Sequence, residues 1–165
     1  MRKAAILMAG IGLALTACNQ NTALGNDREA HLDPASEPAP IEAARPALAN
    51  ADAALLKPAT MGGADIAAIG GREGRCAIKL TEVGFPSFLF EPGGTGYLKL
   101  NGKLIPLSSA GDGRYADGGL LVTLREFDET GNAGLQVAEM IVVLPDEKDE
   151  LGYRGYVQCF SREAV

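Results

Sequence analysis

Hydrophobic and polar residues alternate over short stretches in the C-terminal two thirds of the chain. Residues 75–82 show this pattern, with Cys76, Ile78 and Leu80 on one face and Lys79 and Thr81 on the other. Successive side chains of a strand point to opposite faces, so the pattern predicts a β-strand with one buried face. Further strands are predicted within residues 87–91, 96–108, 120–127, 135–144 and 153–160.

A β-hairpin is predicted at Asn101-Gly102, which lies between two apolar runs. This dipeptide favours a two-residue turn, because both of its residues adopt positive φ at little cost. The turn sets a register in which four apolar residues share one face: Leu98, Leu100, Ile105 and Leu107. Residues 135–144 are apolar on almost both faces and are expected to form the most central strand. Short strands at this spacing predict an all-β domain, either a small antiparallel barrel or a sandwich of about six to eight strands.

The N-terminus has the pattern of a signal peptide. Arg2 and Lys3 precede an uncharged, mostly apolar run over residues 4–17. A helix of that length would reach about 21 Å, which is short of the roughly 30 Å hydrocarbon core of a bilayer. We therefore expect residues 1–17 to be a cleaved signal peptide rather than a transmembrane segment.

The end of this run, Leu15-Thr16-Ala17-Cys18, resembles the lipobox of bacterial lipoproteins. The resemblance implies a mature chain that begins at Cys18 and carries a diacylglycerol on sulfur and an acyl chain, typically palmitate, on nitrogen. Several acyl chains anchor a protein stably to a membrane. Asn19, rather than Asp, follows the cysteine, which implies the periplasmic face of the outer membrane. The alternative is an ordinary secretory signal that happens to contain a cysteine.

Residues 18–57 are expected to link this anchor to the folded part of the chain. They contain few large apolar side chains, many alanines and four prolines: Pro34, Pro38, Pro40 and Pro46. Such a composition does not supply a core pattern and predicts a flexible tether. A short helix over residues 46–57 is the expected exception, with Pro46 in its first turn. The β domain is then expected over residues 58–165, with one helical turn near residues 64–69.

The two remaining cysteines, Cys76 and Cys159, lie on the first and last predicted strands and on the inward face of each alternation. An even pair of cysteines in a small exported domain usually forms a disulfide, because the compartment oxidises thiols. We therefore predict a Cys76–Cys159 bond. Two buried free thiols are the alternative.

Charge and motif content exclude several functions. The formal net charge of −6 argues against a nucleic-acid partner, which would require a basic surface. The only histidine, His31, lies in the tether, so a Ser-His-Asp or Cys-His site cannot be built in the β domain. Four acidic residues follow Pro145, but their spacing is not that of a calcium-binding EF-hand loop: Asp146, Glu147, Asp149 and Glu150. We expect no metal site, no cofactor other than the acyl chains, and no enzymatic activity.

Two resemblances concern the β domain. The first resemblance is to small uncharacterised lipoproteins of alphaproteobacteria, and it covers about residues 55–160. It is carried by Gly84-Phe85-Pro86, residues 99–104 and residues 151–156. That resemblance implies no function.

Residues 109–115 resemble the Ser-Ala-Ser-Gly-Ala-Arg-Tyr loop of periplasmic inhibitors of C-type lysozyme. The resemblance implies an eight-stranded, lipid-anchored barrel with a disulfide, and a binding loop that contains Asp112, Arg114 and Tyr115. Gly111 stands where the inhibitory serine of that family would be, and the tryptophan and Lys-Gly that follow in the family are missing.

The sequence therefore predicts a cell-envelope lipoprotein whose β domain has a non-enzymatic binding or structural role. Its expected partners are the membrane, through the anchor, and an envelope protein or glycan. A periplasmic inhibitor of C-type lysozyme is the alternative.

Overall fold

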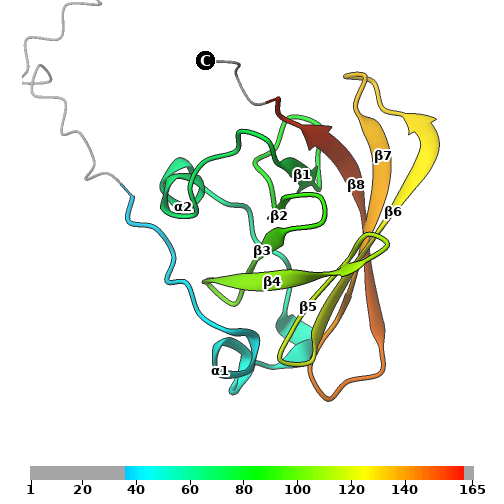
Figure 1. Cartoon of the computed structure of the whole chain (residues 1–165). Helices are drawn as coiled ribbons and strands as arrows, with labels where there is room; N and C mark the ends of the chain where they lie inside the picture. The colour runs from blue at the N-terminus through cyan, green and yellow to red at the C-terminus, as the bar shows by residue number, and fades with distance from the viewer. Residues whose placement is uncertain (1–35, 162–165) are drawn as a thin grey trace, which may run out of the picture. The chain divides into compact units, whose positions relative to one another are not determined.

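Eight antiparallel strands close into a barrel in the computed structural model, which describes residues 36–161 (Figure 1). The strands are β1 Cys76–Lys79, β2 Phe88–Phe90, β3 Thr95–Leu100, β4 Lys103–Gly111, β5 Arg114–Asp117, β6 Leu120–Thr130, β7 Gln136–Val143 and β8 Glu150–Cys159. Each strand pairs with its neighbours in sequence, and β1 pairs with β8 to complete the closure. The predicted all-β fold is confirmed, and it is a barrel rather than a sandwich.

The predicted hairpin is also present, as the turn between β3 and β4. Leu98 pairs with Ile105 and Leu100 with Lys103, so the register is the expected one. Asn101 and Gly102 adopt φ of 50° and 69°, the left-handed conformation that this turn requires. Local sequence therefore determines both the turn and the face that the hairpin turns inward.

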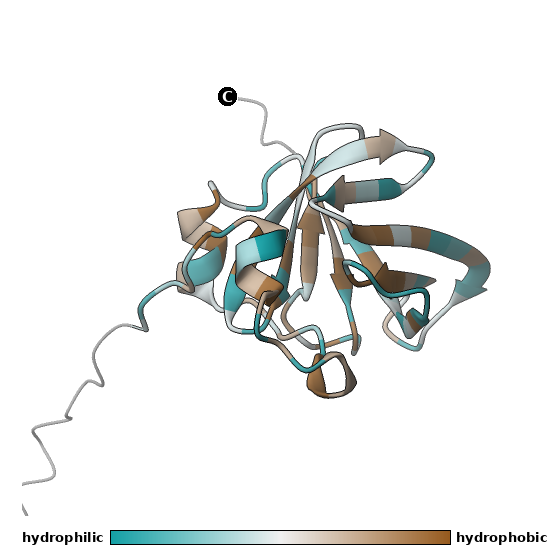
Figure 2. Ribbon diagram, turned by 90° about the horizontal axis from the view of Figure 1, so that it is seen from below, coloured by the Kyte–Doolittle hydropathy of each residue, from teal (hydrophilic) through white to brown (hydrophobic). Residues whose placement is uncertain are grey.

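Apolar side chains fill the barrel interior. Along the strands, hydrophobic residues alternate with more hydrophilic ones (Figure 2). The largest of the fully buried interior residues are Ile78, Phe88, Leu98, Leu100, Ile105, Leu107, Leu120, Val122 and Met140. Gly96 makes room for one of these rings, because a Cβ at its position would lie 2.4 Å from the Phe88 ring. The interior is thus a packed core.

The sequence does not predict β5, which has only four residues and lies between the glycine-containing segments 111–113 and 118–119. Pairing with β4 and β6 holds this strand, so its stability comes from tertiary structure rather than from its own pattern. The expectation of a most central strand also does not apply. β7 pairs with β6 on one side and β8 on the other, as every strand of a closed barrel pairs with two neighbours.

The N-terminal part of the domain differs from the prediction of a tether up to residue 57. Residues 39–69, here called the N-terminal strap, pack against the barrel. The strap contains α1 Ala44–Leu48, the 3₁₀-helix η1 Ala53–Leu55 and α2 Gly63–Ala68. The single helix predicted over residues 46–57 is therefore wrong, because the chain leaves the helix after Leu48 and forms a separate 3₁₀ turn.

Small alanines explain why the composition suggested a tether. Ala44 and Ala47 are 0% and 4% exposed and belong to the same apolar cluster as the barrel interior. The backbone N–H of Ala44 donates to the Asp117 carboxylate at 2.7 Å, and the Asn101 side chain donates to the carbonyl of Ala47 at 2.9 Å. A helix with methyl side chains approaches the barrel closely, although it carries few large apolar residues.

A second apolar cluster lies between the rest of the strap and the outer face of the barrel. Its buried members are Met61, Ile69, Ala77, Leu89 and Leu104. The strap thus covers β1, β2 and β4 from outside. Among residues 36–161, none of the helices is long and apolar enough to span a membrane. The predicted signal peptide, Cys18, His31 and the tether up to residue 35 lie outside the described residues.

Cys76 and Cys159 are joined in the structure, as predicted. They face each other directly across β1 and β8, with their Cα atoms 3.9 Å apart. The Phe160 N–H donates to the Arg75 carbonyl, so the two cysteines occupy a non-hydrogen-bonded pair, where opposing side chains are closest. Cys76 is buried, whereas Cys159 is exposed at the end of its strand. The disulfide therefore joins the two strands that close the barrel.

We expect Cys159→Ser to lower the free energy of unfolding by about 2–5 kcal/mol, because the bond joins residues 83 apart and restricts the unfolded chain. Urea unfolding of the variant and the parent measures this loss. Cys76→Ser should have a similar effect, and the double variant should add little to either. Two alkylatable thiols in protein purified without a reductant would contradict the disulfide.

Candidate functional site

A groove of about 140 Å³ lies on the outer face of the barrel beside the loop between β1 and β2. It is here called the β1–β2 groove. Its lining residues are Ile66, Arg72, Ala77, Lys79, Val83, Gly84, Phe85, Pro86, Leu89, Gln158 and Phe160. They come from the strap, β1, β2, β8 and the connecting loops, so the groove exists only in the folded barrel.

Two large apolar side chains stand in solvent at this groove. Val83 is 93% exposed and Phe85 is 59% exposed, although both belong to a loop with fixed ends. The backbone N–H of Gly84 donates to the Thr81 carbonyl at 3.2 Å, and the N–H of Met61 donates to the Pro86 carbonyl at 2.7 Å. Proline also restricts the residue before it to extended backbone. The loop therefore presents Val83 and Phe85 from a constrained backbone.

Two cations line the same groove. The Arg72 guanidinium lies over the Phe160 ring, 5.3 Å from its centroid. The Lys79 ammonium donates to the Glu82 carbonyl at 2.7 Å and to the Gln158 side chain at 3.2 Å. Neither cation forms an ion pair with a carboxylate of residues 36–161. Positive charge at the groove is thus left without a direct acidic partner in the described part of the chain.

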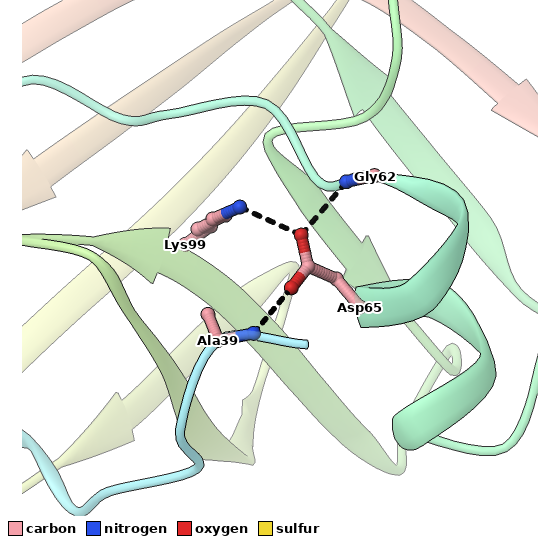
Figure 3. Close-up of polar contacts among 4 residues, drawn as sticks. All are labelled: Ala39, Gly62, Asp65 and Lys99. Carbon is pink, nitrogen blue, oxygen red and sulfur yellow. Dashed lines mark hydrogen bonds and ion pairs between the residues drawn. The ribbon is translucent and has the colours of Figure 1, made fainter. Parts of the chain in front are cut away.

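Helix α2 supplies one wall of the groove through Ile66, and the neighbouring Asp65 holds this helix in place (Figure 3). One carboxylate oxygen of Asp65 accepts from the Ala39 N–H at 2.7 Å. The other accepts from the Gly62 N–H at 2.7 Å and from the Lys99 ammonium at 2.6 Å. Asp65 thereby connects both ends of the strap to β3.

The pKa of Asp65 reflects this environment. Burial would raise the pKa, but the hydrogen bonds from Ala39, Lys99 and Gly62, together with the charge of Lys99, outweigh burial and lower it below its ordinary value. The carboxylate is therefore charged at neutral pH, and its charge is compensated inside the strap. The role of this group was not predictable from the sequence, because its partners Ala39 and Lys99 lie 26 and 34 residues away.

The loop predicted to bind a partner, with Asp112, Arg114 and Tyr115, is a hairpin between β4 and β5. The Asp112 side chain is 93% exposed, and its Oδ2 atom lies 3.6 Å from Nη2 of Arg114. Tyr115 is only 3% exposed, points into the barrel and donates its hydroxyl to the Glu91 carbonyl at 3.1 Å. The prediction that Tyr115 belongs to a binding loop is therefore wrong, because strand alternation turns its side chain inward. Of the three predicted residues, Asp112 and Arg114 have exposed side chains at the hairpin tip.

The acidic residues after β7 border a different hollow at the end of the barrel near α1. That hollow has a volume of about 380 Å³, and its lining includes Leu48, Leu56, Asp146 and Glu147. No group of three or more potential metal-ligating side chains gathers in the part of the chain that the structure describes. The β1–β2 groove is smaller, but it combines two large exposed apolar side chains, Val83 and Phe85, with two cations.

The residues of the groove were only partly predictable. Gly84-Phe85-Pro86 stood out through a resemblance alone, and nothing in the sequence pointed to Arg72 or Lys79. Arg72 lies in an irregular segment, and Lys79 looks like an ordinary outward residue of a strand. The sequence nevertheless contained one indication of an exposed apolar loop. Val83 and Phe85 are apolar residues on either side of a glycine, between two predicted strands.

Fold and groove together define a closed antiparallel barrel with an external N-terminal strap and a small amphipathic surface groove. The chain belongs to the family described as a domain of unknown function, DUF6692, which matches residues 14–162. No curated protein and no solved structure matches the chain.

We expect Asp65→Asn to lower the free energy of unfolding by about 1–3 kcal/mol, because it removes a charge-assisted hydrogen bond in a buried site. Amide hydrogen exchange at Ala39 and Gly62 should accelerate more than in the barrel strands. The pKa of Asp65 is lowered in the folded state, so its contribution is complete above the unfolded value of about 3.9 and is lost as the pH falls through the folded value. The difference between parent and variant should therefore be constant above about pH 5 and shrink below about pH 4.

Glu42→Gln provides the matched control, since Glu42 pairs with Lys103 at 3.1 Å where both side chains are about one third exposed. A partly exposed pair of this kind contributes less than about 1 kcal/mol. Equal losses in the two variants, or a difference for Asp65→Asn that does not change with pH, would contradict the role of Asp65.

Proposed function

We propose that this chain is a cell-envelope lipoprotein, anchored through Cys18 at the periplasmic face of the outer membrane. Its barrel has a non-enzymatic role and binds an envelope protein through the β1–β2 groove. The observation that carries the binding role is the exposure of Val83 and Phe85 beside the cations of the groove. Exposed apolar side chains on a constrained loop are typical anchors of protein interfaces.

The chemistry of the groove suits recognition. Its floor is apolar, at Ala77, Leu89 and Phe160, and its polar lining groups are two cations and one amide. These groups can bury an apolar side chain and orient a charged one. Because the core of the barrel is packed with side chains, we propose that such binding takes place on the outer surface.

Two features support export and anchoring. The lipobox-like segment that ends at Cys18 would supply the lipid anchor. The Cys76–Cys159 pair is of the kind that persists in an oxidising compartment.

The anchor is tested with Cys18→Ala. We expect this variant to lose metabolic palmitate labelling and to leave the membrane fraction or remain as an uncleaved precursor, because the thiol that accepts the diacylglycerol is gone. Cys159→Ser is the control, because it also removes a cysteine but should still be labelled with palmitate at Cys18. Normal palmitate labelling of Cys18→Ala would reject the anchor.

Inhibition of a C-type lysozyme is a second candidate, which the exposed tip of the β4–β5 hairpin favours. Asp112 and Arg114 project there from an eight-stranded barrel, the fold that the resemblance implies. In this case the partner would contact the hairpin rather than the β1–β2 groove.

Site-specific photocrosslinking in intact cells distinguishes these surfaces. We expect a crosslinker placed at Val83 to give a discrete adduct, and one placed at Leu55, which is 77% exposed elsewhere on the domain, to give none. Both positions are exposed, so the substitutions should leave the fold intact. An adduct with a lysozyme at Asp112, together with inhibition of that enzyme, would support the second candidate. Equal labelling at all three positions would speak against both.

A further inference from the structure

We propose that the β1–β2 groove binds an acidic peptide segment in which one medium-sized aliphatic side chain serves as the anchor. The inference rests on the proposed binding function and specifies the chemistry of the partner. It concerns the apolar floor of the groove, its volume and its two cations.

The volume of the groove limits the size of the anchor. A cavity of about 150 Å³ accepts a group the size of benzene. At about 140 Å³, the groove accommodates one aliphatic side chain such as leucine, isoleucine or methionine. It is too small to enclose a pair of acyl chains, so a peptide side chain fits it better than a membrane lipid.

Val83 and Phe85 extend the apolar surface beyond the groove itself. They are the two most accessible apolar side chains of its lining, and each would lose contact with water when a peptide covers it. Burial of apolar area is the main favourable term in association, and a few central aromatic and aliphatic residues usually supply most of it. Phe85 is therefore the expected hot spot.

The cations decide the charge of the peptide. Arg72 and Lys79 both line the groove and form no ion pair with a carboxylate within residues 36–161. Glu82, the acidic residue nearest to Val83 in sequence, directs a carboxylate oxygen to the Ala133 N–H at 3.0 Å in the β6–β7 turn. Aspartates or glutamates that flank the anchor would meet Arg72 and Lys79, although the whole chain carries a net charge of −6.

Closure of the barrel determines how such a peptide binds. At the groove, β1 pairs with β2 and β8, and β2 pairs with β1 and β3, so neither strand offers a free edge there for an added strand. Recognition therefore relies on side chains: the anchor in the groove, and the flanking carboxylates on Arg72 and Lys79.

Peptide selection tests this proposal. The bait is the whole mature chain from residue 18 with Cys18→Ser, which prevents acylation, and the probe is a library of random linear peptides. We expect enriched peptides to share one aliphatic residue flanked by Asp or Glu. Binding of a selected peptide should weaken about tenfold or more in Phe85→Ser and remain unchanged in Leu55→Ser, which alters a more exposed apolar residue elsewhere.

Charge reversal gives the sharper test. In the Arg72→Glu, Lys79→Glu double variant, selection should switch to peptides with Lys or Arg beside the anchor. The single variant Arg72→Glu changes an exposed side chain and keeps the test valid if the double variant does not fold. Lys148→Glu, at an exposed position of the β7–β8 loop, is the matched control and should leave the selected peptides unchanged.

Several results would overturn the proposal: no enrichment, enriched peptides without acidic residues, or no switch after charge reversal. Binding of the bait to phosphatidylglycerol vesicles through Phe85, without peptide binding, would assign the groove to a membrane surface instead. If selection fails but Val83 still crosslinks to a protein in cells, the peptide class is wrong while the binding function stands. If both fail, neither proposal holds.

Discussion

The pairing of β1 with β8 is the constraint on which the rest of the structure depends. Only four residue pairs connect these strands, and β2, the strand next to β1, has only three residues. Short strands contribute few hydrogen bonds and little buried surface. The disulfide at the end of β1 and the apolar cluster under the strap both act on this region. Together they compensate for the weak closure, one through a covalent bond and the other through burial of apolar surface.

The strap also determines where the candidate site forms. It covers the outer face of β1 and β2 and is hydrogen-bonded to the loop that joins them at Pro86, while Val83 and Phe85 of that loop remain exposed. Asp65 fixes the position of α2, and the neighbouring Ile66 completes the groove. A buried carboxylate that does not itself line the groove thereby contributes to the shape of the surface that we propose binds a partner.

Much of the fold could be predicted because its signals are local. Asn101-Gly102 determines a turn through its own backbone preferences. Period-two alternation assigns Ile78 and Leu98 to the interior without knowledge of the residues that contact them in space. The strap could not be predicted in this way. Ala44 and Ala47 carry little hydrophobic signal, and their burial depends on how closely the helix approaches the end of the barrel.

The sequence by itself determined the all-β class, the β3–β4 register and the pairing of Cys76 with Cys159, because each follows from neighbouring residues or from counting. Only the tertiary structure decided that the sheet closes, that Tyr115 turns inward, and that Asp65 meets Ala39 and Lys99. The groove belongs to the second group, since Arg72, Lys79 and Phe85 come together only when β1, β2 and the strap pack on one another. The physical reason is that local preferences act between neighbours in sequence, whereas a surface site joins segments that are distant in the chain.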